Sequence, residues 1–291
     1  MRLPVLTGLL VLLASGAAAQ QLSAPLASPP ARVQQTVGLT ELAVEYHRPA
    51  VNGRPVWGAL VPYGEVWRAG ANENTVFETS TEVQVEGQPL PAGRYGVHMI
   101  PTDGAWTVIF STVSEAWGSY SYDPAEDALR VTVTPREGPM QERLAYRFDG
   151  PDTAAAELVL HWEELEVPVR LTVDTPGVVL QSMERELRGV SGFYGGAWDQ
   201  IAAYALDHGR RTEDALGWVD RSIELGPTFS NRMTKAGLLD ALGRSAEAEA
   251  LRTEAYAEAS EDDVRAYARA RRRAGKPAEA EAALARLGER P

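Results

Sequence analysis

The chain contains no cysteine in its 291 residues. This absence excludes disulfide bonds, thiolate metal sites, iron–sulfur clusters, cysteine nucleophiles and cysteine-linked lipid anchors. The sequence also has no apolar run close to the ~20 residues that a transmembrane helix requires, so we expect no insertion into a membrane. Lysine is nearly absent as well, because Lys235 and Lys276 are the only two lysines among 28 basic residues.

Positive charge is in deficit, since 40 acidic residues leave the chain with a net charge of −12. Residues 20–176 have 10 arginines and 21 acidic residues, a net of −11, whereas residues 177–291 have 17 basic and 19 acidic residues, a net of −2. The phosphates of nucleic acids bind to clusters of positive charge. We therefore predict no nucleic-acid partner.

The first residues have the pattern of a secretory signal. Arg2 precedes a short apolar stretch, and Ala17–Ala19 offers the small residues that a signal peptidase requires. We predict a signal peptide over residues 1–19, cleaved near Ala19, and a periplasmic or secreted mature protein. A flexible linker is expected over residues 20–30, which end in two prolines.

Residues 31–176 contain short alternating or β-branched runs between turn residues, the pattern of antiparallel strands with one wet face. About ten such runs without intervening helical patterns predict a β-sandwich or a β-barrel rather than a parallel sheet. A four-residue turn is expected at Glu86–Pro89. The expected strands are Leu42–Tyr46, Thr75–Thr79, Glu82–Glu86, Tyr95–Ile100, Trp106–Phe110, Leu129–Val133, Leu144–Phe148, Glu157–Trp162 and Val167–Val173.

Residues 177–291 are rich in Ala, Leu, Glu and Arg with helical spacing. Three segments end in Gly209, Gly243 and Gly275, at intervals of 34 and 32 residues, and an Ala-rich run follows each glycine. This pattern resembles the tetratricopeptide repeat, a helical hairpin with a period of 34 residues. The alternative is an irregular helical bundle in which the glycines cap helices.

The most specific sequence in the β-domain is Val66–Asn72, which reads Val-Trp-Arg-Ala-Gly-Ala-Asn. Together with Leu90–Tyr95 and Trp117–Tyr120, this block resembles the bacterial family called domain of unknown function 2911, over roughly residues 31–175. The resemblance implies exported proteins, some with tetratricopeptide-like helices behind the β-domain. It implies no activity.

The block around Val66–Asn72 also supplies the candidate ligand residues. Its glycines and prolines predict an ordered loop, its aromatic rings offer flat apolar faces, and its arginines offer forked donors suited to a carboxylate or a sugar. Alternatively, the polar groups bond loop carbonyls and the aromatic rings plug the end of the sandwich. The candidate residues are Arg54, Trp57, Tyr63, Trp67, Arg68, Asn72, Thr75 and His98.

Catalytic templates are missing from the sequence. It has no Gly-x-Ser-x-Gly elbow, no His-Glu-x-x-His, no Walker loop and no dinucleotide fingerprint. His47, His98 and His161 lie in expected strands, where three imidazoles would suit zinc if they converged. Single hydrogen-bonded histidines are the simpler interpretation, and we predict no cofactor and no metal ion.

Three functional hypotheses follow. The favoured one is an exported, non-catalytic binding or scaffold protein, whose β-domain holds a small ligand or glycan at Trp67–Thr75 and whose repeats bind a protein or peptide. The second is a periplasmic hydrolase of an envelope carbohydrate or ester, with Arg68 or Asn72 steadying an anion and His98 as acid or base. The third assigns all function to the repeats and leaves the β-domain purely structural.

Overall fold

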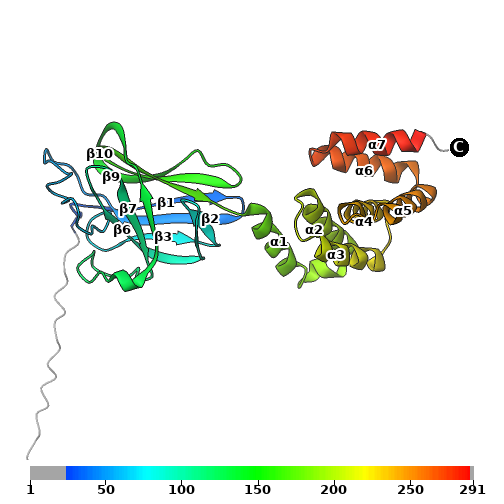
Figure 1. The fold of residues 1–291 in the computed structure, drawn as a ribbon, viewed down its shortest axis with the longest axis horizontal. Helices are drawn as coiled ribbons and strands as arrows, with labels where there is room; N and C mark the ends of the chain where they lie inside the picture. Colours follow the sequence, from blue (N-terminus) through cyan, green and yellow to red (C-terminus); the bar gives the residue numbers. More distant parts are fainter. Residues whose placement is uncertain (1–23, 289–291) are drawn as a thin grey trace, which may run out of the picture.

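A computed structural model describes residues 24–288 of the chain. The expected signal peptide and residues 20–23 of the expected linker lie outside this range. The described residues form two parts, ten strands in two antiparallel sheets followed by seven α-helices (Figure 1). The β-domain is therefore a sandwich and not a barrel. No helix within the described range is long and apolar enough to cross a membrane.

The larger sheet has the strand order β1-β2-β3-β6-β7-β8. Neighbouring strands are antiparallel, and pairs such as Phe77 opposite Tyr95 place alternate side chains on the inner face. Its strands are β1 (Pro30–Val37), β2 (Thr40–His47), β3 (Thr75–Thr79), β6 (Gly93–Ile100), β7 (Trp106–Ser111) and β8 (Asp127–Val133).

The smaller sheet has the order β5-β4-β10-β9. Glu86 and Gly87, both at positive φ (49° and 78°), join β4 to β5 in a tight hairpin turn, so the turn is shorter than the four residues expected. The strands are β4 (Val83–Val85), β5 (Gln88–Leu90), β9 (Arg136–Asp149) and β10 (Ala155–Thr172).

The single strand β10 replaces two expected strands, Glu157–Trp162 and Val167–Val173. The four residues between them, 163–166, do not end the strand: Glu163 adopts a positive φ of 55°, and the register with β9 shifts on both sides of it. A β-bulge therefore lets the strand continue.

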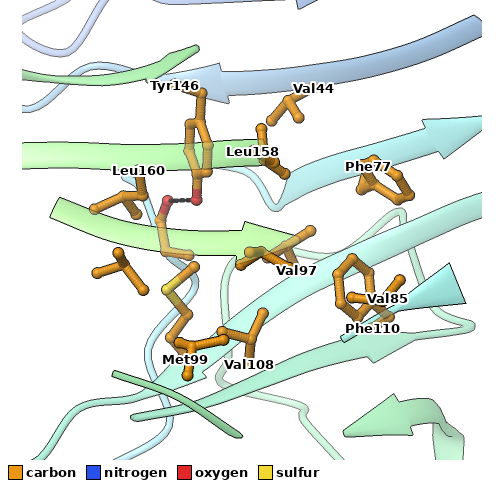
Figure 2. Close-up of a cluster of buried hydrophobic side chains, with 14 of the residues drawn as sticks. Val44, Phe77, Val85, Val97, Met99, Val108, Phe110, Tyr146, Leu158 and Leu160 are labelled. Atoms are coloured by element: carbon orange, nitrogen blue, oxygen red, sulfur yellow. Dashed lines mark hydrogen bonds between the residues drawn. The ribbon is translucent and has the colours of Figure 1, made fainter. Parts of the chain in front are cut away.

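The hydrophobic core lies between the two sheets and contains side chains of both. Figure 2 shows Phe77, Val97 and Phe110 of the larger sheet facing Leu158 and Leu160 of β10. Burial of such side chains contributes about 1.5–3 kcal/mol each. This core is the main source of stability in the β-domain.

The last residues of the expected linker are attached to the β-domain. The carbonyl groups of Ala27 and Ser28 accept hydrogen bonds from Arg143 (3.1 Å) and Asn72 (3.2 Å). Strand β1 begins at Pro30, the first residue of an edge strand, where the missing N–H of proline disrupts no ladder. The ordered structure therefore starts upstream of residue 31.

The helical part contains three consecutive helical hairpins, α2/α3, α4/α5 and α6/α7, and α4 packs on both α2 and α6. A further helix, α1, precedes them. The bounds are α1 (Thr175–Glu186), α2 (Gly195–Asp207), α3 (Thr212–Leu225), α4 (Phe229–Ala241), α5 (Ser245–Glu258), α6 (Glu261–Arg273) and α7 (Pro277–Gly288).

Glycine ends the first helix of each hairpin, as the repeat pattern predicts. Gly209, Gly243 and Gly275 have φ of 60°, 76° and 74°, a left-handed conformation that costs glycine little. In all three, the next N–H bonds the carbonyl five residues back, at 2.8–2.9 Å. This is a Schellman cap, repeated at the turn of each hairpin.

Helix α1 lies between the sandwich and the first hairpin (Figure 1). Val178 packs against the β-domain core, whereas Leu180, which is 1% exposed, packs on Ile201, Ala202 and Ala205. The same helix therefore belongs to two hydrophobic cores.

We expect Leu180→Ala to lower the free energy of unfolding of the helical part by about 3 kcal/mol, because it leaves a cavity in the core of the first hairpin. Hydrogen exchange should show faster opening of α2 and α3. The control Val178→Ala should instead increase exchange in β10. Equal effects of both variants on the two parts would contradict the division of α1 between two cores.

Candidate functional site

The loop before β3 is anchored by one buried carbonyl group, that of Ala69. Trp67 exchanges two 2.8 Å backbone hydrogen bonds with Met99 of β6, and Ala69 then adopts a positive φ of 49°. Its carbonyl accepts from the Tyr146 hydroxyl at 2.9 Å (Figure 2) and from the Thr75 hydroxyl at 3.1 Å. Burial raises the pKa of Tyr146, so its hydroxyl keeps the proton that it donates. Thr75, a candidate ligand residue, thus holds the loop.

Four tryptophans close this end of the sandwich. The ring of Trp57 lies 5.8 Å from Trp67, 4.9 Å from Trp106 and 5.7 Å from Trp162, each edge to face, and Trp67 stacks on Trp162 at 6.0 Å. Two candidate ligand aromatics are therefore packed against the core. Tyr63 lies apart from them and is 46% exposed.

The polar candidates of the loop donate to backbone carbonyls. Arg54 bonds two carbonyls of the preceding turn at 2.6 and 3.0 Å, Arg68 bonds the Asn72 carbonyl, and the Asn72 amide bonds Ser28. With Trp67, these three residues line a shallow cleft of about 470 Å³. Four of the eight candidate residues therefore lie together around this cleft. The hydrogen-bond donors of its polar residues are already used to hold the loop.

His98 lies in a different environment, on the outer face of the larger sheet beneath residues 112–126, which join β7 to β8. Its Nδ1 is 2.8 Å from the Ser119 hydroxyl, and its ring lies 5.1 Å from that of Tyr122, whose hydroxyl donates to Asp127 at 2.8 Å. His98 is 3% exposed and does not line the loop cleft.

Burial sets the protonation state of His98. Desolvation lowers its pKa to about 4, the Asp127 carboxylate acts in the opposite direction, and the nearby Arg68 guanidinium adds to the decrease. The imidazole is therefore neutral at pH 7, and its hydrogen bond with Ser119 holds the covering segment on the sheet.

The other two strand histidines have separate partners. His47 Nε2 lies 3.4 Å from a Glu73 oxygen, and His161 Nε2 lies 2.7 Å from the Pro139 carbonyl oxygen. The three imidazoles do not converge. Within residues 24–288, no group of three or more His, Asp or Glu side chains is placed to hold a metal ion.

A larger cleft, which the sequence reasoning missed, lies on the outer face of the larger sheet. It has a volume of about 840 Å³ and lies between β1–β3 and residues 114–117, and its lining includes His47, Asn74 and Trp117. We call it the outer-sheet cleft. Two features of the sequence could have indicated this cleft. Trp117 lies in the polar segment after β7, and the alternation of buried and exposed side chains in β2 turns His47 away from the core.

A second large cavity, of about 820 Å³, crosses the helical part. Residues at intervals of three and four line it from α2 (Gln200, Tyr204), α4 (Met233) and α6 (Tyr267, Ala270), so each helix contributes one face. Faces of α5 and α7 complete the lining. We call this cavity the helical groove.

The fold defines a two-part protein, a β-sandwich with a tryptophan-plugged end followed by helical hairpins. Residues 28–171 match the family model described as "Protein of unknown function (DUF2911)", and the β-domain of this chain belongs to that family. The match does not extend into the helices. Comparisons with curated proteins and with solved structures each gave no match.

We expect Arg68→Ala to lower the free energy of unfolding of the β-domain by about 1–2 kcal/mol, because the Asn72 carbonyl loses its charged donor. Arg68→Lys should recover only part of this loss, since an ammonium lacks the planar fork. Urea melts measure the effect, and Arg170→Ala at an exposed position serves as the control. An unchanged midpoint for Arg68→Ala would contradict a structural role and return Arg68 to the ligand candidates.

We expect the β-domain to lose stability as the pH falls from 6.5 to 4. The folded-state pKa of His98, about 4, lies below its ordinary value of 6.5, so the unfolded chain binds more protons in this window. The loss should reach about 2–3 kcal/mol at pH 4. His98→Asn, which keeps a group near Ser119 and removes the titration, should flatten the dependence in urea melts.

Ser119→Ala is the control for that series. This variant should lower the free energy of unfolding by about 1 kcal/mol at every pH and leave the slope of stability against pH unchanged. A slope that persists in His98→Asn would assign the pH dependence to other groups.

Proposed function

We propose that this chain is an exported, non-catalytic binding protein, in which the β-domain holds a small ligand or glycan and the helical hairpins bind a protein segment. Export is supported by the signal-peptide pattern of residues 1–19. The observation that carries the binding proposal is the helical groove, whose volume of about 820 Å³ suits an extended or helical segment of a partner.

The charges of the helical groove are paired within the chain. Arg271 bonds Asp207 at 2.6 Å and Glu279 at 2.8 Å, and Arg286 bonds Glu249 at 2.8 Å. These pairs hold the long side chains in place before a partner arrives, which reduces the entropy that binding would cost. Between them lie apolar side chains and small alanines, so the groove suits a partner segment with mixed apolar and polar residues.

The hydrolase hypothesis has less support from the geometry. A general acid or base must reach its substrate within hydrogen-bond distance. His98 is almost fully buried and hydrogen-bonded to Ser119, and although the Arg68 guanidinium lies near it, the imidazole does not line the loop cleft. The third hypothesis, a purely structural β-domain, would require that the β-domain bind no small ligand.

The groove is tested by photo-crosslinking in the host cell. A photoreactive residue at Gln200 or Ala270, both exposed in the groove, should crosslink a discrete partner, whereas one at the exposed Ala246, outside the groove, should not. The partner is then purified and its affinity for the full chain is measured.

A matched pair of substitutions completes the test. Ala270→Arg fills the groove and should weaken binding of the purified partner at least tenfold, while Ala246→Arg should leave it unchanged. Both positions are exposed helical alanines, so each variant should change stability by less than about 0.5 kcal/mol. Equal crosslinking at all three positions, or binding insensitive to Ala270→Arg, would overturn the assignment of the groove.

A further inference from the structure

The outer-sheet cleft is built by a segment that folds back over the sheet. Residues 112–126 cover the outer face of β6 and β7, and Gly96 permits the contact, because a Cβ there would lie 2.3 Å from the Val113 carbonyl oxygen. The Asn74 N–H bonds the Ala116 carbonyl at 3.1 Å, which fixes the edge of the segment beside β3. The cleft of about 840 Å³ opens between this edge and the outer face of β1 and β2.

Two buried acceptors of this cleft have no partner. Across residues 24–288, six buried side-chain polar atoms lack a hydrogen bond, and two of them, His47 Nδ1 and Asn74 Oδ1, belong to residues that line the outer-sheet cleft. The His47 Nε2 lies 3.4 Å from a Glu73 oxygen, and assigning the ring proton to Nε2 leaves Nδ1 as an acceptor. The Asn74 amide nitrogen faces the Val113 carbonyl at 3.4 Å, which assigns Oδ1 as the free acceptor. Both atoms are closed to solvent in the free chain, so a ligand that donates hydrogen bonds would reach them only after the side chains rotate toward the cleft.

The charges around the cleft disfavour an anionic ligand. Arg94 bonds Glu78 at 2.9 Å and Glu45 at 3.2 Å, and Arg32 bonds Glu45, so the two lining arginines are already neutralised. The carboxylates of Glu73 and Glu115 also line the cleft. A carboxylate or phosphate would meet an acidic wall with no free cation.

One aromatic side chain offers a platform beside these acceptors. Trp117 lines the cleft and is 61% exposed, so the face of its indole is available to a ligand. Its flat apolar face suits the C–H face of a sugar ring, whose hydroxyl groups point outward around the edge.

We propose that the outer-sheet cleft binds a neutral carbohydrate, with a pyranose ring stacked on Trp117 and two hydroxyl groups donating to Asn74 Oδ1 and His47 Nδ1 after these side chains rotate toward the cleft. The proposal rests on the proposed function of the chain as a binding protein, and it places the glycan on the outer face of the larger sheet, where only Glu73 and Asn74 of the Trp67–Thr75 loop contribute to the lining.

The test titrates the full chain with cellobiose, maltotriose, chitotriose and mannotriose, and with digalacturonate as an acidic comparator, by calorimetry and saturation-transfer NMR. At least one neutral saccharide should bind, and digalacturonate should bind at least tenfold more weakly. Trp117→Ala should weaken binding at least tenfold, and Asn74→Ala at least fivefold. The control Tyr120→Ala removes an aromatic of the same segment that is 83% exposed and does not line the cleft, and it should leave affinity unchanged.

Binding of none of the neutral saccharides below 10 mM, stronger binding of digalacturonate, or an equal effect of Trp117→Ala and Tyr120→Ala would overturn the proposal. Because Trp117 is exposed, its variant tests the cleft even if Asn74→Ala fails to fold. Ala270→Arg in the helical groove should leave saccharide binding intact. If no saccharide binds while the partner still binds through the groove, only the carbohydrate site is contradicted. If a saccharide binds while partner binding does not depend on the groove, only the groove assignment is contradicted.

Discussion

The arrangement of the β-domain loop depends on one buried backbone carbonyl. The Ala69 oxygen accepts hydrogen bonds from the hydroxyl groups of Tyr146 in β9 and Thr75 in β3. These bonds connect the smaller sheet, the loop and the larger sheet. A buried acceptor without partners would cost about 1–3 kcal/mol. With both partners in place, Ala69 is held in a left-handed conformation, Trp67 is fixed beside Met99, and Asn74 is placed at the start of β3. The residues around this point contribute to both clefts, because Arg68 and Asn72 line the loop cleft and Asn74 lines the outer-sheet cleft.

Most of the fold could be predicted because its elements have local signals. Thr75–Thr79 matches β3 residue for residue, and the three glycines at intervals of 34 and 32 residues end helices as expected. Edge strands gave weaker signals: Arg136–Arg143 is polar, β9 is the last strand of its sheet with only residues 49–51 bonded to its outer side, and β1 begins within the expected linker. The bulge at Glu163 depends on pairing with β9, which a single strand sequence does not reveal.

The candidate site was harder to predict, because residue type does not show where a donor is used. Arg68 and Asn72 have the chemistry of ligand groups, yet their donors reach the carbonyls of Asn72 and Ser28. His98 is buried only because residues 112–126 fold over it, a long-range contact without a local pattern. The outer-sheet cleft is formed by the same contact, so Asn74 could not be identified before the path of that segment was known.

Helix α1 contributes one side chain to the core of each part of the chain. Val178 and Leu180 are two residues apart and so point about 200° apart around the helix axis, one into each hydrophobic core. Turning the helix to improve one contact would break the other. If the outer-sheet cleft and the helical groove bind as proposed, two surfaces joined in this way would meet a target that displays both ligands at one set spacing, and the second contact would form at a high effective concentration. Such a protein would select for how its ligands are spaced on a surface, and two weak contacts would then suffice for stable attachment.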